Sequence, residues 1–298
     1  MSDSDHTLLI GVDGGGTGCR VAAGTLAKGV LGRAEGGRAN ATSDPALAIR
    51  NVLETVHAAA QVAGFSAEAL NDAVAHIGLA GVMTADDSTR IANALPFAHA
   101  SVTDDRPTAI AGALGDQDGY LLAIGTGTIV ASSQRGEFTY VGGWGFQISD
   151  QSSGAWLGNM ALRRTILCHD GLTSHSDLTH GLLLRFNDDP NEIVRFAAGA
   201  TPRDYATLAP KIVEAANAGD LWGLTIMKEG ADYLVQALST LGFLPGDALC
   251  LTGGVGPHYA PYLPAEALRG RVSSRGGSLD GAFQLAARHA ANEKEGVQ

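Results

Sequence analysis

Two glycine- and threonine-rich turns, each set between short apolar segments, limit what this chain can fold into more than any other feature. The first turn, Asp13-Gly-Gly-Gly-Thr17, follows the apolar run Thr7–Val12 and precedes a second apolar run, Cys19–Leu26. The other turn, Gly125-Thr-Gly-Thr128, also separates two apolar runs. Short apolar runs closed by glycines are typical of buried strands that enter a tight turn, so the sequence predicts a β-hairpin at each place.

Predicted helices and strands alternate after each hairpin. In the first half, Asp44 and Pro45 open a helix, and Val74–Leu79 is predicted to be a further buried strand. In the second half, a largely helical stretch covers about 153–241, and Leu279–Ala291 is the last helix. Alternating helices and strands joined by short loops predict the α/β class.

This repetition predicts two similar domains, 1–115 and 116–298, with 153–241 as a helical insertion in the second. The two halves share an architecture but little sequence identity. No low-complexity linker separates them, so we expect a hinge near residue 115. Whether the last helix packs back onto the first domain is left open.

Charge and cysteine content argue against several classes of function. The 298 residues carry 20 Lys plus Arg and 31 Asp plus Glu, a formal net charge of −11, which disfavours nucleic acids and anionic membranes as partners. Cys19, Cys168 and Cys250 lie far apart, which argues against a disulfide framework or a zinc knuckle and fits a reducing cytoplasm. The sequence shows no signal-peptide pattern and no uninterrupted run of about 18 apolar residues, so we expect a cytoplasmic protein without a membrane span.

The glycines of the first turn suit the binding of an anion, because backbone N–H groups can approach it without obstruction by side chains. Two standard phosphate-binding patterns do not fit. Thr17 stands where the Walker pattern requires lysine, and Cys19 stands where the dinucleotide-binding pattern requires glycine. Gly253-Gly254, after a predicted late strand, adds a third glycine turn to the set.

Asp13 stands at the mouth of the first turn, where its charge repels an anion. Two like charges about 4 Å apart cost on the order of 4 kcal/mol at an effective dielectric constant near 20. A divalent cation between the carboxylate and a phosphate, held through water, removes that cost and predicts a hydrated Mg²⁺. The alternative is a hairpin in which Asp13 only caps the turn. The second glycine/threonine turn, at an equivalent place, favours phosphate binding.

The chain resembles the superfamily of sugar kinases, heat-shock ATPases and actin, and within it the N-acetylglucosamine kinase branch grouped with the BadF/BcrA-type ATPases. The resemblance implies two actin-like (ribonuclease H-like) lobes with a nucleotide-binding cleft between them. The matching segments follow the family's order and span nearly the whole chain: Gly11–Thr17, Thr103–Ala113, Leu122–Thr128, Gly142–Asp150 and Leu251–Val255.

The same resemblance implies roles in nucleotide binding, with ATP and Mg²⁺ as cofactors. Asp13 would hold the hydration shell of Mg²⁺, and Gly253 and Gly254 would border the adenosine pocket. The residues implied to bind the phosphates of ATP are Gly14, Gly15, Gly16, Thr17, Thr126 and Gly127.

The family's catalytic base is an Asp placed before a helix that resembles Pro107–Leu114. Asp104 and Asp105 both stand there, and counting back from that helix favours Asp105, with Asp104 as the alternate. A carboxylate of this kind orients a sugar hydroxyl and takes its proton. The alternative for Asp105 is an ordinary helix N-cap.

Sugar contacts are implied for Asn40, Thr126, Trp144, Gly145 and Asp150. An indole face suits a pyranose ring, and a carboxylate accepts hydrogen bonds from two hydroxyls. The alternatives are a loop residue that satisfies its own backbone for Asn40 and core packing for Trp144.

The resemblance therefore implies an ATP-dependent kinase that phosphorylates the 6-hydroxyl of N-acetylglucosamine or glucosamine. It also leaves two alternatives: a BadF-type ATPase that activates a 2-hydroxyacyl-CoA dehydratase, and a sugar or nucleotide sensor without turnover. Some relatives form homodimers, so we expect one here.

Overall fold

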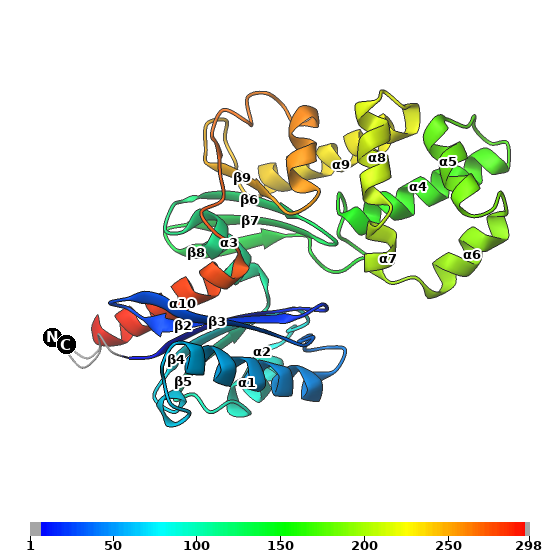
Figure 1. Ribbon diagram of the computed structural model, residues 1–298. Helices are drawn as coiled ribbons and strands as arrows, with labels where there is room; N and C mark the ends of the chain where they lie inside the picture. The colour runs from blue at the N-terminus through cyan, green and yellow to red at the C-terminus, as the bar shows by residue number, and fades with distance from the viewer. Residues whose placement is uncertain (1–6, 296–298) are drawn as a thin grey trace. The chain divides into compact units, whose positions relative to one another are not determined.

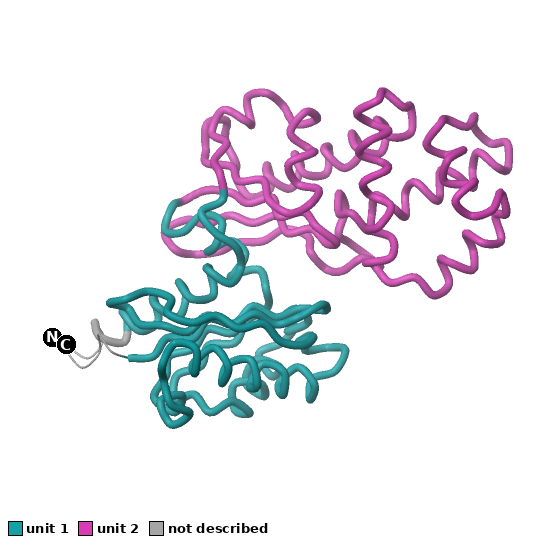
Figure 2. The backbone as a smooth tube through the Cα atoms, in the orientation of Figure 1, with its two compact units in different colours: residues 1–117, 274–298 teal, residues 118–273 magenta. Residues whose placement is uncertain are grey.

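The computed structural model describes residues 7–295 (Figure 1). The chain divides into two compact units: residues up to 117 together with those from 274 onward, and residues 118–273 (Figure 2). We call these unit 1 and unit 2.

Unit 1 is a five-stranded sheet with helices on both faces, in the strand order β3-β2-β1-β4-β5. β1, β2 and β3 form an antiparallel meander, whereas β4 and β5 run parallel to β1. The elements of unit 1 are β1 (Leu9–Gly14), β2 (Cys19–Thr25), β3 (Gly29–Gly36), α1 (Pro45–Val62), the 3₁₀ turn η2 (Glu68–Leu70), β4 (Val74–Leu79), α2 (Ala85–Asn93), β5 (His99–Thr103), α3 (Arg106–Leu114) and α10 (Ser278–Glu295).

Successive side chains of β1 point to opposite faces of the unit 1 sheet, so this strand contributes apolar side chains to both faces. Ile10 and Val12 belong to the core that includes the buried side chains of α1, while Leu9 packs with Ala286 and Ala290 of α10 on the opposite face. Gly11 lies against the backbone of Phe283, where a side chain would collide. The glycine therefore lets α10 pack directly on the strand that leads to the first turn.

Unit 2 repeats the same strand order with a later set of strands, β10-β9-β6-β7-β8. β6, β7 and β8 form the antiparallel meander, and β9 and β10 run parallel to β6. Its elements are β6 (Gly119–Ile124), β7 (Thr128–Gln134), β8 (Glu137–Val141), α4 (Gly154–His169), α5 (Asp177–Arg185), α6 (Pro190–Gly199), α7 (Pro202–Ala206), α8 (Ala209–Asn217), α9 (Leu221–Thr240), β9 (Leu249–Thr252), the 3₁₀ segment η3 (Gly256–Tyr262) and β10 (Arg271–Val272).

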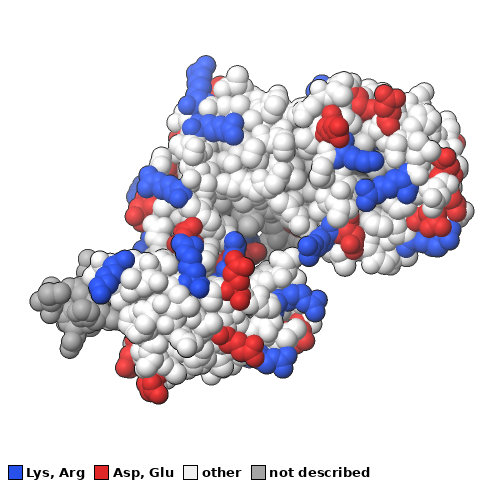
Figure 3. Space-filling view, viewed as in Figure 1, with Lys and Arg blue, Asp and Glu red and all other residues white. Residues whose placement is uncertain are grey.

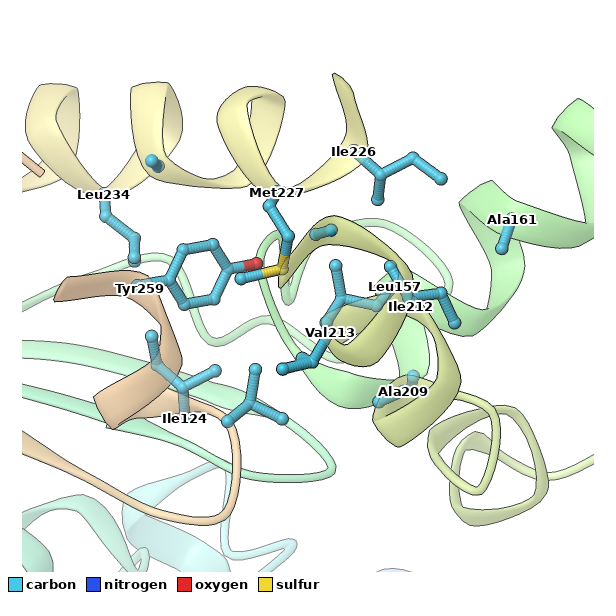
Figure 4. Close-up of a cluster of buried hydrophobic side chains, with 14 of the residues drawn as sticks. Ile124, Leu157, Ala161, Ala209, Ile212, Val213, Ile226, Met227, Leu234 and Tyr259 are labelled. Atoms are coloured by element: carbon cyan, nitrogen blue, oxygen red, sulfur yellow. The ribbon is translucent and has the colours of Figure 1, made fainter. Parts of the chain in front are cut away.

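A continuous apolar cluster joins the sheet of unit 2 to its helices. Figure 4 shows Ile124 of β6, Met227 of α9 and Tyr259 of η3 pointing toward one another. Tyr259 is buried, and its hydroxyl donates a hydrogen bond to the carbonyl oxygen of Ser152 at 2.8 Å. The helical region is thereby fixed to the sheet through its core.

The α/β class and the hairpin at the start of each half are confirmed, as is the helix that begins at Pro45 with Asp44 as its N-cap. α2 begins at Ala85, where Thr84 and Asp87 form a capping box. β3 was not predicted from the residues, since half of its residues are exposed and most are polar or glycine.

The compact units are not two continuous halves of the chain. α10 follows the whole of unit 2 in the sequence but belongs to unit 1. Its alanines Ala286 and Ala290 pack on Leu9 and Val74 of the first sheet. The division at residue 115 stays a prediction about domains.

No helix within residues 7–295 is both long and apolar enough to span a membrane. On the face drawn in Figure 3, basic and acidic side chains are interspersed.

Candidate active site

The first turn joins β1 to β2 and leaves open space beside its backbone. The N–H of Gly15 donates to the carbonyl of Gly18 at 2.9 Å, and the N–H of Ala39 donates to the carbonyl of Gly15 at 3.0 Å. Nothing lies within 4 Å of the positions that side chains would occupy at Gly15 and Gly16. The turn is therefore fixed by hydrogen bonds and accessible to a ligand.

A pocket of about 530 Å³ lies against this turn, within unit 1. This volume falls in the range of small-molecule sites, roughly 300–1,000 Å³. Gly14, Gly15 and Thr17, all predicted to bind phosphate, line it, and so do Asp13 and Asp105. Residues that the sequence placed in separate motifs thus meet at one pocket.

Asp13 has a partner in the structure that the sequence argument did not foresee. Its Oδ2 accepts a hydrogen bond from Nε of Arg20 at 3.1 Å and a second one from Nη2 of the same guanidinium. The Asp13 side chain is 13% exposed and that of Arg20 is 52% exposed. The positive charge of Arg20 can therefore balance the carboxylate of Asp13 at the turn without a metal ion.

Asp104 and Asp105 have different surroundings. Asp104 accepts hydrogen bonds from the backbone N–H, Nε and Nη2 of Arg106, each at 2.8 Å. Burial alone would raise the pKa of Asp104, but these bonds hold it below its ordinary value. Asp104 is thereby committed to a local ion pair.

Asp105 occupies the N-cap position of α3, but its carboxyl makes no capping hydrogen bond to that helix. Burial, followed by the charges of Asp104 and Asp13, raises its pKa to about 6. A carboxyl with such a pKa is ionised at neutral pH yet able to hold a proton. This is the environment that a general base needs.

Asn40 shows the backbone contacts of the loop alternative. Its Oδ1 accepts the backbone N–H groups of Thr42 at 3.0 Å and Ser43 at 2.9 Å. The preceding residue, Ala39, donates to Gly15, so the Asn40 loop is attached to the first turn. The side-chain oxygen is engaged locally, and sugar contact by Asn40 stays a prediction.

In unit 2, the second turn is held by the N-terminus of α4. The N–H groups of Gly154 and Ala155 donate to the carbonyls of Gly125 at 2.8 Å and Thr126 at 3.3 Å. These bonds use helix N–H groups that lack partners within the helix. The side chain of Thr126 stays exposed.

Asp150 lies beside this turn. Its Oδ2 is 3.0 Å from the position that a side chain would occupy at Gly127, and burial raises its pKa. Trp144 is 73% exposed, which does not fit the core-packing alternative. Gly145 has a φ of 93°, a conformation that favours glycine. These predicted sugar residues therefore form a partly exposed loop against the second turn.

Gly253 comes next to the second turn through the parallel pairing of β9 with β6. A side chain at Gly253 would collide with the backbone of Ile124, and the N–H of Val255 donates to the carbonyl of Ile124 at 2.9 Å. Gly253 and Gly254 are both exposed. The role in adenosine binding stays a prediction.

The predicted residues thus form two groups, one in each unit. The first contains Asp13, the first turn, Asn40 and Asp105, and the second contains the second turn, Trp144, Asp150 and the late glycines. Sequence reasoning missed Arg20 and Glu35, which also line the first pocket. The sequence signal for Arg20 is its place as an exposed charge in the second strand of a predicted hairpin.

Comparison with known proteins supports the resemblance. The chain is 29% identical over 278 residues to the glucosamine kinase of Vibrio cholerae, which covers 93% of this chain and 95% of that protein. It is 27% identical over 243 residues to the N-acetylmuramic acid/N-acetylglucosamine kinase of Clostridium acetobutylicum, with 78% of each chain covered.

A solved structure from Chromobacterium violaceum, provisionally named an N-acetylglucosamine kinase, is 32% identical with a TM-score of 0.84, and the match covers 95% of this chain and 99% of that one. The model of one family, described as the BadF/BadG/BcrA/BcrD ATPase family, matches residues 10–280. Because this match spans most of the sequence, the chain belongs to the BadF/BadG/BcrA/BcrD ATPase family.

Proposed function

We propose that this protein is an ATP-dependent kinase that phosphorylates the 6-hydroxyl of an amino sugar, either glucosamine or N-acetylglucosamine. The observation that carries the proposal is Asp105, a carboxyl with a raised pKa that lines the same pocket as the glycine turn. The names of the relatives, kinases of glucosamine, N-acetylglucosamine and N-acetylmuramic acid, support the substrate class.

In the proposed reaction, Asp105 accepts the proton of the sugar hydroxyl as that oxygen forms a bond to the γ-phosphorus of ATP. The bond between the γ-phosphorus and the bridging β–γ oxygen breaks, and ADP leaves. General base catalysis of this kind contributes about 10²–10⁴-fold. Asp104 is the weaker candidate, because Arg106 occupies both of its carboxyl oxygens.

The first turn is proposed to bind the terminal phosphates of ATP. Its open backbone at Gly15 and Gly16 leaves room for an anion, and Thr17 lines the pocket beside them. Catalysis of phosphoryl transfer depends mainly on positioning of the reactants and on neutralisation of charge, and backbone N–H groups at the turn would contribute to both.

The donor set also fits a hydrated Mg²⁺. Asp13 and Asp105 both line the pocket, and the charge of Asp13 contributes to the raised pKa of Asp105. Magnesium is usually bound by one or two carboxylates and the substrate phosphates while it keeps several waters. Asp13 would hold the ion through water, and the bound ion would neutralise charge on the phosphates.

The second turn and the loop that carries Trp144 and Asp150 are proposed to contact the sugar. An exposed indole can cover one face of a pyranose ring, and the half-buried carboxyl of Asp150 can accept two hydroxyl hydrogens. Gly253 and Gly254 are proposed to border the adenosine.

The test is a coupled assay of ADP release with Mg²⁺·ATP and a panel of amino sugars. We expect turnover with glucosamine or N-acetylglucosamine and none with their 6-deoxy analogues. Asp105→Asn should bind sugar but lose nearly all turnover, whereas Asp104→Asn serves as the matched variant and should retain most of it. A brown, iron-containing protein from anaerobic purification would instead favour the dehydratase-activator alternative.

A further inference from the structure

Arg20 on β2 lies between an acidic residue on β1 and another on β3. The register of β1 and β2 pairs Asp13 with Arg20, and the register of β2 and β3 pairs Arg20 with Glu35. Residues that face each other across antiparallel strands share one face of the sheet. All three line the pocket beside the first turn, as does Asp105.

Arg20 is the more exposed partner of its ion pair with Asp13. Its side chain is 52% exposed, whereas that of its partner Asp13 is only 13% exposed. Among the described residues that line the pocket, Arg20 alone carries a positive charge, against the carboxyls of Asp13, Glu35 and Asp105. An anionic ligand entering this pocket therefore meets three carboxylates and one cation, and that cation is bound to one of the carboxylates.

We propose that Arg20 binds the terminal phosphates of ATP by exchanging partners: it balances Asp13 in the free protein and moves to the nucleotide when a magnesium ion takes over the Asp13 carboxylate. This inference rests on the proposed kinase function. The guanidinium suits both partners, because its planar set of N–H donors matches carboxylate and phosphate geometry equally well.

The exchange predicts a particular link between magnesium and nucleotide affinity. Without the metal, ATP must compete with Asp13 for the guanidinium and also faces the uncompensated carboxylate. With the metal, both obstacles are removed together. Removing the Asp13 charge should therefore raise the affinity for metal-free ATP, as magnesium raises the affinity of the wild type. The same change should abolish the response of the affinity to magnesium.

Calorimetric titration with a non-hydrolysable ATP analogue, in EDTA and in Mg²⁺, tests this directly. Arg20→Gln should weaken binding of the magnesium complex by about 10- to 100-fold, the range expected for hydrogen bonds between charged groups. Arg20→Lys should restore part of that loss. Asp13→Asn should bind the metal-free analogue more tightly than the wild type does and gain little from Mg²⁺.

Arg33→Gln is the matched control. Arg33 lies on β3 and pairs with Asp280 at 2.8 Å, and its side chain is similarly exposed, but it does not line the pocket. This variant should bind the magnesium complex with wild-type affinity. Thermal unfolding midpoints of all the variants show whether any loss of affinity reflects loss of the fold.

Wild-type affinity in Arg20→Gln, or no gain of metal-free affinity in Asp13→Asn, would overturn the exchange while leaving the kinase function in place. Absence of magnesium-assisted binding by the wild-type protein, with and without amino sugars, would overturn both proposals.

Discussion

Asp104 and Asp105 are adjacent in the chain, yet their carboxyl groups have pKa values shifted in opposite directions. Arg106 lowers the pKa of Asp104 against the effect of burial, whereas burial and the neighbouring charges of Asp104 and Asp13 raise that of Asp105 to about 6. Pairs of titratable groups whose surroundings separate their pKa values are typical of sites that perform acid–base chemistry. This contrast singles out Asp105 and leads to the first two predictions.

The proposed base should set the acid limb of the pH profile. Since Asp105 accepts a proton only when ionised, kcat/KM should fall about tenfold per pH unit below its pKa of about 6 and level off above it. Asp104→Asn removes a charge that raises this pKa, so its acid limb should move to lower pH. Initial rates between pH 4.5 and 8 measure both profiles, and identical profiles would contradict the assignment.

Replacing the base should also stabilise the fold. The pKa of Asp105 is higher in the folded protein, about 6, than its ordinary value of 3.8. Its contribution to stability is therefore fully present below about pH 4 and lost as the pH rises through 6. At neutral pH the ionised carboxyl lowers the free energy of unfolding by about 1–3 kcal/mol.

Asp105→Asn should accordingly raise the thermal unfolding midpoint at pH 7.5 and lose that advantage near pH 4. Asp104→Asn gives the contrast, because it breaks the hydrogen bonds to Arg106 and should lower the midpoint at pH 7.5. Calorimetric scans at the two pH values measure these differences. A lower midpoint for Asp105→Asn at pH 7.5 would mean that its carboxylate is stabilised by contacts other than those described.

His76 should make the protein sensitive to acid. The ring is buried in β4, its Nδ1 has no hydrogen-bond partner among the described residues, and it stacks on His289 with ring centroids 5.8 Å apart. Burial, then the charge of His289, lowers its pKa from 6.5 to about 3. The unfolded chain therefore binds more protons as the pH falls from 6.5 toward 3, and stability is lost over that window.

His76→Leu removes this titration, so its unfolding midpoint should fall less between pH 7.5 and pH 5 than that of the wild type. The exposed His57 offers a matched comparison, and His57→Gln should leave the dependence unchanged. The informative quantity is the change in midpoint between the two pH values, because loss of the contact between His76 Nε2 and Thr103 at 3.3 Å affects both. Equal pH dependence in all three proteins would contradict the prediction.

The packing of α10 on α3 should depend on glycine at their contact. A side chain at Gly281 would collide with the carbonyl oxygen of Thr108 and with the backbone of Gly112. Gly281→Ala should therefore lower the free energy of unfolding by about 1–3 kcal/mol or more, the usual cost of overpacking. Urea denaturation, followed by a spectroscopic signal from unit 1, measures the loss in free energy of unfolding.

Gly181→Ala is the control for that substitution. Gly181 lies inside α5, and nothing is within 4 Å of the position of an added side chain. Alanine there should stabilise the protein by about 0.5–1 kcal/mol through its higher helix propensity. Destabilisation of similar size by both variants would mean that the α3–α10 contact is not the cause.

The local elements of the fold were predictable because their signals are local. An apolar run, a glycine turn and a second apolar run determine a hairpin without help from the rest of the chain, and both predicted hairpins formed. Asp44 and Pro45 began α1 for the same reason. β3 was missed because an exposed strand rich in glycine and charge lacks the apolar pattern of a buried one.

The site was predictable only in part. The motifs identified Asp13 and the turn glycines, but the Arg20 contact to Asp13 depends on the register between β1 and β2. The place of α10 in unit 1 depends on a contact between segments about 270 residues apart, such as Gly11 and Phe283. The second relation leaves no trace in the residues close to it in sequence, because it joins segments far apart in the chain.

The sequence by itself determined the two hairpins and the α/β alternation, because turn formation and apolar periodicity act over a few neighbouring residues. Tertiary structure alone decided which of two adjacent aspartates is paired and which has a raised pKa. Burial and charge interactions depend on distance in space, and the folded chain sets those distances.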